Sequence, residues 1–213
     1  MNHISHTQPR RAFTLTELMV VITIMGVLVA FVLPSFTSVS ASHQLTAASQ
    51  AIRGQIALAR QTAVTSNRIV QVRFYKVAAY DQGPTSAPSV YRGMQCFVST
   101  DLPRGVAGAR LTPLSPVLWL AKPIVLSDNA QASTLLSTTE QPADPDFPLP
   151  YYGLNYRYKV FRFSADGKTD LSSTTNCLTA ILGNAKIQGG GLPSNFVTLQ
   201  IDPITGTLRE YRP

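Results

Sequence analysis

Residues 13–34 read FTLTELMVVITIMGVLVAFVLP, and this run decides how the rest of the chain is organised. It approaches the ~20 apolar residues that a helix needs to cross a membrane, and no other stretch of the chain does so. Arg10 and Arg11 stand just before it, and basic residues flanking an apolar helix are retained in the cytoplasm. We therefore expect the run to insert in a membrane with its N-terminus in the cytoplasm and with everything after Leu33 outside.

Two classes of N-terminal segment share this basic flank and apolar run. A secretory signal peptide has an apolar stretch of roughly 7–15 residues and a small-x-small cleavage site, for which Val39-Ser40-Ala41 is the candidate. The run in this chain is longer, and its Glu17 carboxylate costs about 2.5–3.5 kcal/mol inside a membrane, so it needs a partner. Cleavage between Ala12 and Phe13 would free an α-amino group that could pair with Glu17 of a neighbouring subunit.

The residues around this bond resemble the N-terminus of a type IV prepilin. Arg10-Arg11-Ala12 followed by Phe13-Thr14-Leu15-Thr16-Glu17-Leu18 is similar to the class III signal cut by prepilin peptidase, although glycine is usual where this chain has Ala12. The resemblance implies cleavage between Ala12 and Phe13, N-methylation of Phe13, an assembly role for Glu17 and a helix bend at Pro34. Residues 1–12 are then a leader peptide, and residues 13–33 form the transmembrane and assembly half of a long helix.

The chain after this run continues with the pattern of an amphipathic helix. Apolar residues recur at spacings of three and four, which places them on one helix face. These residues are Leu45, Ala48, Ile52, Ile56, Ala59 and Ala63. We expect residues 34–67 to form the second half of the helix, to pack on a sheet and to end at Ser66-Asn67.

Residues 68–213 are expected to form a β-rich domain. Short β-branched and aromatic runs alternate with turn residues, and ten of the 15 prolines lie between Pro84 and Pro150, which excludes long helices there. The expected strands are Ile69–Val77, Tyr91–Ser99, Val117–Leu120, Ile124–Ser127, Tyr151–Phe163, Cys177–Leu182, Phe196–Ile201 and Thr207–Tyr211. A short helix capped by Asp128 and ending near Leu136 is also expected. The fold class is therefore α+β, with a long N-terminal helix packed on an antiparallel sheet.

Two turns extend the resemblance beyond the helix. The F-x-x-D-G turn of Phe163, Asp166 and Gly167 and the D-P-x-T-G hairpin that begins at Asp202 are similar to those of GspH/FimT-type minor pseudopilins. More narrowly, residues 73–76, 161–163 and 201–213 resemble the Verru_Chthon cassette protein D family. The resemblance implies a structural subunit of a type IV pilus-like or type II secretion-like filament. Its partners would be prepilin peptidase and other pilin subunits, and its domain would lie in the periplasm before filament assembly.

The sequence offers no catalytic or metal-binding constellation. Cys96 and Cys177 lie 81 positions apart, outside any zinc-ligand spacing, and they form either a disulfide or two buried free thiols. Residues 189–191 are glycines without the Lys-Ser/Thr of a phosphate loop. The pairs Asp144/Asp146 and Asp166/Asp170 are too sparse for a calcium loop and are interpreted as solvated turns. We expect no enzymatic activity, no metal and no cofactor.

An alternative function is DNA or ligand binding at a filament tip. The formal net charge is +7, and some FimT-like minor pilins capture DNA through C-terminal arginines. The candidates in this chain are Arg209 and Arg212, with Arg157 and Arg162 as a second group. Glu210 lies between the first two, which weakens the pattern.

Overall fold

A computed structural model describes residues 14–100, 110–172, 176–183 and 191–213, with residues 30–39 described by their backbone alone. The chain divides into two compact units, Met1–Ala41 and Ser42–Pro213. Within the described residues, no helix has an apolar window long enough to cross a membrane.

The helix α1 extends from Leu15 to Ser66 and ends in a defined cap. Asn67 adopts the left-handed conformation with φ 52°, which asparagine tolerates better than most residues. The N–H of Arg68 donates to the carbonyl of Ala63 over 3.1 Å, and the N–H of Asn67 donates to that of Val64 over 3.4 Å. This pair of bonds is a Schellman motif, so the predicted stop at Ser66-Asn67 is confirmed.

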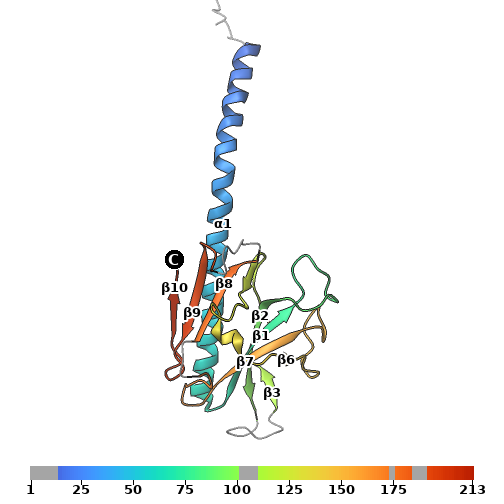
Figure 1. The fold of residues 1–213 in the computed structure, drawn as a ribbon, viewed down its shortest axis with the longest axis vertical. Helices are drawn as coiled ribbons and strands as arrows, with labels where there is room; N and C mark the ends of the chain where they lie inside the picture. Colours follow the sequence, from blue (N-terminus) through green and yellow to red (C-terminus); the bar gives the residue numbers. More distant parts are fainter. Residues whose placement is uncertain (1–13, 101–109, 173–175, 184–190) are drawn as a thin grey trace, which may run out of the picture. The chain divides into compact units, whose positions relative to one another are not determined.

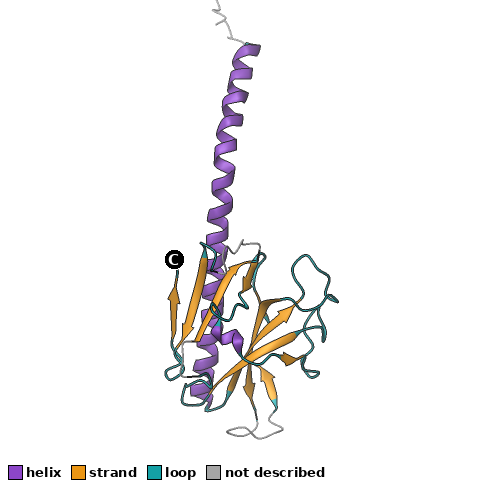
Figure 2. Cartoon of the chain, in the orientation of Figure 1, coloured by secondary structure: helices purple, strands orange, loops and turns teal. Residues whose placement is uncertain are grey.

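The second unit is an antiparallel sheet packed on the second half of α1 (Figures 1 and 2). Its strands are β1 (Val70–Val77), β2 (Val90–Ser99), β3 (Leu111–Pro113), β4 (Leu118–Trp119), β5 (Ile124–Leu126), β6 (Gln141–Pro142), β7 (Arg157–Phe163), β8 (Asn176–Leu182), β9 (Phe196–Ile201) and β10 (Leu208–Tyr211). The order is β10-β9-β8-β5-β2-β1-β7-β6, with β3 and β4 also paired to β2. The expected strands Ile69–Val77 and Tyr91–Ser99 pair as one antiparallel hairpin, and Phe196–Ile201 and Thr207–Tyr211 pair as another. The α+β class is confirmed.

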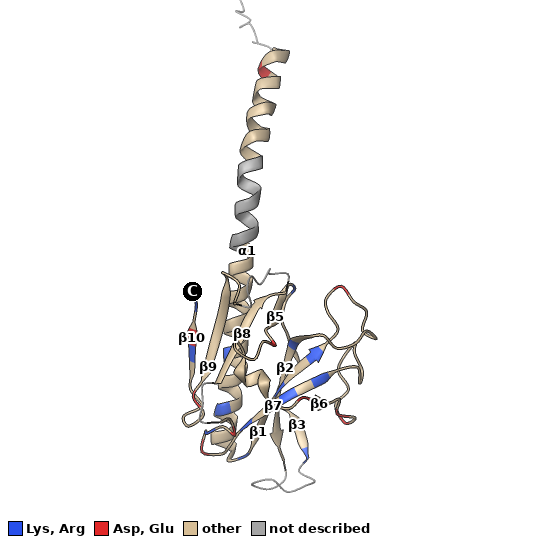
Figure 3. Ribbon diagram, in the orientation of Figure 1, with Lys and Arg blue, Asp and Glu red and all other residues tan. Residues whose placement is uncertain are grey.

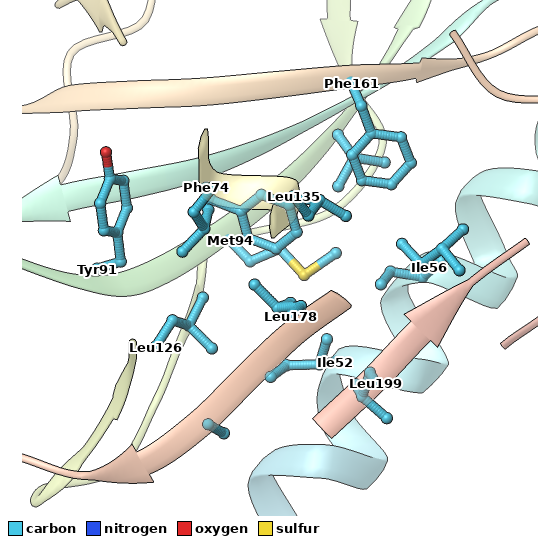
Figure 4. Close-up of a cluster of buried hydrophobic side chains, with 14 of the residues drawn as sticks. Ile52, Ile56, Phe74, Tyr91, Met94, Leu126, Leu135, Phe161, Leu178 and Leu199 are labelled. Atoms are coloured by element: carbon cyan, nitrogen blue, oxygen red, sulfur yellow. The ribbon is translucent and has the colours of Figure 1, made fainter. Parts of the chain in front are cut away.

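The predicted apolar stripe of the helix forms one side of the main core. Leu45, Ala48, Ile52, Ile56, Ala59 and Ala63 are each at most 7% exposed. Figure 4 shows Ile52 and Ile56 near Leu178 and Leu199, with Phe74 and Met94 in the same cluster. Burying such side chains contributes about 1.5–3 kcal/mol each, so this stripe attaches the helix to the sheet.

The opposite face of the sheet is covered by the connection between β6 and β7. Tyr75 and Tyr156 belong to a second buried cluster there, with ring centroids 5.3 Å apart. The Arg73 side chain is 2% exposed, and its Nη2 lies 2.9 Å from Oδ2 of Asp144. The guanidinium carbon Cζ lies 4.5 Å from the ring centroids of both Phe97 and Tyr158. Arg73 is therefore buried although it is charged, because the connection between β6 and β7 shields this face of the sheet from water.

Three expectations about the strands and the short helix need correction. The strands β3 and β6 are additional, and they are too short to leave a periodic pattern. The short helix is the 3₁₀ helix η1 (Thr134–Ser137), preceded by Ser133 rather than capped by Asp128. The expected strand Tyr151–Phe163 begins only at Arg157, because the chain turns sharply before it, with φ 71° at Tyr151.

Cys96 and Cys177 are both free thiols, so the disulfide considered above is not formed. The Cys96 side chain faces the helix, where its Sγ lies 3.6 Å from the carbonyl oxygen of Gln55. Cys177 precedes Leu178, whose side chain is in the helix-facing core, so Cys177 faces the other side of the sheet. Burial raises the pKa of the Cys96 thiol to about 12. The alternative, two buried free thiols, is confirmed for Cys96, whereas Cys177 is only half-buried.

Candidate assembly surface

The first part of α1 presents apolar side chains on every side. All eleven described large apolar side chains from Leu15 to Val29 are exposed, by between 41% and 76%. They are Leu15, Leu18, Met19, Val20, Val21, Ile22, Ile24, Met25, Val27, Leu28 and Val29. A helix that is apolar all round is normally buried in a large core or a membrane. We call residues 15–29 the assembly surface.

Local hydrogen bonds fix the start of this helix. Thr14 Oγ1 accepts the N–H of Glu17 over 3.2 Å, and the carbonyl of Thr14 accepts the N–H of Leu18 over 3.2 Å. Thr-x-x-Glu is the capping-box spacing, and the first helical turn is where the helix dipole stabilises a negative charge. Thr14 and Glu17 thus begin the helix directly after the expected cleavage site. Ala12 and Phe13 lie outside the described residues, so cleavage and methylation stay predictions.

Glu17 is the only ionisable side chain between Phe13 and Ser42. In Figure 3 the described part of this segment carries a single charged position, coloured red. The hydroxyl of Thr23 donates a hydrogen bond to the carbonyl of Met19 over 2.8 Å, so it has a partner within the helix. The carboxylate is therefore the one group of the assembly surface that calls for an external partner in apolar surroundings.

The predicted bend at Pro34 is not tested by the structure. Pro34 lies within residues 30–39, which are described by their backbone alone, and α1 is assigned through them. The bend stays a prediction.

The four arginines proposed for DNA do not form one surface. Arg209 is exposed on β10, whereas Arg157 and Arg162 are on β7. Five strands separate β10 from β7, which corresponds to about 29 Å at ~4.8 Å per strand. Arg157 lies 3.7 Å from Glu140, and Arg162 lies 3.2 Å from Asp170.

Arg212 belongs to a C-terminal latch made by four side chains. Glu210 accepts hydrogen bonds from Ser49 over 2.8 Å, from Arg53 over 3.1 Å and from Arg212 over 2.7 Å. Burial alone would raise the pKa of Glu210, but these three donors lower it. The latch holds β10 along α1. Sequence reasoning missed it, because the pattern shows the i, i+4 pair Ser49/Arg53 but not the strand that meets it.

The two turn motifs are brought together, although their glycines lie 39 positions apart in the sequence. The carbonyl of Pro203 accepts the N–H of Thr169 over 2.9 Å, and Arg60 Nε donates to the carbonyl of Thr205 over 2.8 Å. A Cβ at Gly206 would lie 2.5 Å from the carbonyl oxygen of Gly167. We call these segments, residues 164–169 and 202–207, the paired turns. They tie the end of the sheet to the helix.

Three of the four aspartates considered for calcium have protein partners. Asp144 pairs with Arg73, Asp166 with Lys168 over 3.1 Å and Asp170 with Arg162. In the part of the chain that the structure describes, no group of three His, Cys, Asp or Glu residues is placed to hold a metal ion.

Among the comparisons with known proteins, a family model matches the N-terminal part of the chain. Residues 8–33 match the prokaryotic N-terminal methylation motif. No curated protein sequence matches the chain. The fold is similar to the minor pseudopilin EpsH of the Vibrio cholerae type 2 secretion system, at 12% identity and a TM-score of 0.42, covering 80% of this chain and 98% of that one. It is also similar to the type IV minor pilin FimU of Pseudomonas aeruginosa, at 13% identity and a TM-score of 0.42, covering 80% and 93%. The matched residues 8–33 include the expected cleavage site, Glu17 and the whole assembly surface.

Proposed function

We propose that this chain is a structural subunit, a minor pilin or pseudopilin, of a type IV pilus-like or type II secretion-like filament. The observation that carries the proposal is the assembly surface: residues 15–29 of the helix are apolar on every side, and their only ionisable group is Glu17 in the first turn. The methylation motif at residues 8–33 supports the same conclusion. The resemblance to GspH/FimT-type proteins, and more narrowly to the Verru_Chthon cassette protein D family, is part of this proposal.

The proposed route begins in the inner membrane. Residues 13–33 cross it once, with residues 1–12 in the cytoplasm as a leader and residues 68–213 in the periplasm. Prepilin peptidase cleaves between Ala12 and Phe13, and the new amine of Phe13 is methylated. Residues 34–67 continue the helix into the domain.

Assembly then exchanges lipid for neighbouring helices. The apolar side chains of the assembly surface remain buried in both states, so their burial changes little. The Glu17 carboxylate, which costs about 2.5–3.5 kcal/mol in lipid, gains the cationic N-terminus of an adjacent subunit. The ion pair therefore favours the filament over the membrane. The role is structural, and the proposal includes no catalytic step.

DNA binding is not part of the proposal. Three of the four candidate arginines pair with Glu140, Asp170 or Glu210, and the two groups lie at distant strands.

The role of Glu17 is tested by Glu17→Gln, which removes the charge and keeps the size. We expect normal membrane insertion and reduced incorporation into sheared filaments. Thr16→Val is the matched control, because it changes a polar neighbour on the same turn without removing the carboxylate. Equal incorporation of wild type and Glu17→Gln would contradict the role of the carboxylate.

Mass spectrometry of the native protein tests the processing. The proposal requires a mature chain that begins at Phe13 and carries one added methyl group. A chain beginning at Ser42 would instead support the secretory signal peptide, cleaved after Ala41.

A further inference from the structure

A groove follows the flank of α1 that the sheet leaves uncovered. Its volume is about 800 Å³, within the ~300–1,000 Å³ of ordinary binding sites. Side chains between Gln50 and Thr65, about 22 Å of helix, line one side. Residues 206–208, which are the end of the preceding turn and the first residue of β10, line the other. The lining includes Arg53, Gly54, Ala57, Arg60, Val64 and Leu208. Small side chains on the helix leave the groove open.

The groove lies beside a free edge of the sheet. Among the described strands β10 has β9 as its only neighbour, so alternate N–H and C=O groups of β10 point away from the sheet. The contacts Arg60 to Thr205, Arg53 to Glu210 and Arg212 to Thr46 show that this edge runs antiparallel along the helix. One further strand beside β10 would therefore lie over the groove.

The charge of the groove indicates what such a strand would carry. Arg53 and Arg60 line it, and no aspartate or glutamate is among its described lining residues. The Arg53 side chain is 47% exposed although it pairs with Glu210, so solvent still reaches it. A second copy of this chain is a poor partner, because the formal net charge of +7 stays at +5 after Arg10 and Arg11 leave with the leader, so two copies repel each other. An acidic segment from a different protein is complementary.

We propose that a neighbouring, different filament subunit adds a short, extended, acidic segment to the free edge of β10, over this groove. Backbone hydrogen bonds to β10 bind the segment, and its carboxylates meet Arg53 and Arg60. This is recognition by strand addition, in which the edge supplies affinity and alternate side chains supply specificity. The inference rests on the proposed function, because it names the chemistry of a partner within the filament.

Peptide binding to the full-length protein in detergent micelles tests the inference. The probe is a fluorescently labelled peptide, about ten residues long, in which glutamate and valine alternate. Its binding is measured by fluorescence anisotropy. We expect it to bind at least about tenfold more tightly than the same peptide with lysine for glutamate, and to weaken as salt is raised. A proline at the centre of the acidic peptide should weaken binding, because it removes a backbone donor.

Gly54→Leu provides the matching change in the protein. A Cβ at Gly54 meets nothing within 4 Å, so the leucine fills the groove, and leucine favours a helix more than glycine does. We expect binding to fall at least about tenfold while helix content, measured by circular dichroism, is kept. Gly83→Leu is the control, because its Cβ also has open space but lies in the loop between β1 and β2.

Equal binding of the acidic and basic peptides, or of Gly54→Leu and wild type, would overturn the inference. The assay requires no filament, so it separates this inference from the proposed function. Glu17→Gln should leave peptide binding unchanged while it reduces filament incorporation.

Discussion

Removing the Asp144 carboxylate should leave the buried guanidinium of Arg73 without its ion partner. Arg73 Nη2 lies 2.9 Å from Asp144 Oδ2, and Arg73 Nε donates to Gln71 Oε1 over 2.9 Å. The third nitrogen, Nη1, already has no hydrogen-bond partner in the structure. Asp144→Ala therefore leaves a charge, 2% exposed, with one side-chain acceptor and the faces of aromatic rings.

The magnitude follows from burial. Breaking a fully buried ion pair costs about 3–5 kcal/mol. The Asp144 side chain is 21% exposed, so water can approach its position, and we expect a loss of about 2–3 kcal/mol in the free energy of unfolding. Adding Arg73→Met removes the stranded charge and keeps an unbranched apolar side chain. The double variant should therefore be about 1 kcal/mol more stable than Asp144→Ala alone.

Urea unfolding of residues 42–213 measures both changes. This fragment is the second compact unit and contains the main core, and Trp119, the only tryptophan, reports its unfolding by fluorescence. Asp146→Ala is the control, because Asp146 is an exposed aspartate two residues away and should change stability by less than about 0.5 kcal/mol. An equally small effect of Asp144→Ala would refute the reasoning.

Three further predictions concern single groups of the domain. The pKa of Glu210 is lowered in the folded state, so its contribution to stability is complete above the unfolded-state value of about 4.3 and is lost as the pH falls through the folded-state value. Urea unfolding across this pH range measures the loss of stability on acidification. In Glu210→Gln the part of this loss that comes from protonation of Glu210 should be absent. At pH 8, a thiol reagent should modify Cys177 in the folded protein and Cys96 only after unfolding. Peptide mapping identifies the modified cysteine. If neither cysteine reacts in denaturant, the two form a disulfide and the prediction is wrong. Gly93→Ala should destabilise the domain by about 1–3 kcal/mol and alter Trp119 fluorescence, because the new Cβ would lie 2.7 Å from the Trp119 ring; unchanged stability and emission would contradict this contact.

The parts of the fold that follow from local patterns were predictable from the sequence. The spacing of Leu45, Ile52 and Ile56 on one face predicted which side of the helix is buried, because helical periodicity directly encodes a face. The hairpins followed from β-branched runs and their turns. Glu17 stood out because a carboxylate is rare in an apolar run.

The parts that depend on contacts between distant segments were not predictable. Gln71 and Arg73 alternate with apolar residues, a pattern that is also typical of a solvent-facing strand row, but the connection before β7 covers them. The alternation of polar and apolar residues along a strand shows which residues share a face of the sheet. It does not show whether another segment of the chain covers the polar face. Glu210 was similarly interpreted only as a charge between two arginines, since its contacts with Ser49 and Arg53 bridge about three quarters of the chain.

The paired turns have a practical consequence for tracking this protein in cells. The backbone of Gly206 lies so close to that of Gly167 that an epitope tag inserted in either segment would push apart the end of the sheet and Arg60 of the helix. The exposed loop around Gly83 has open space beside it and is the better place for such a label.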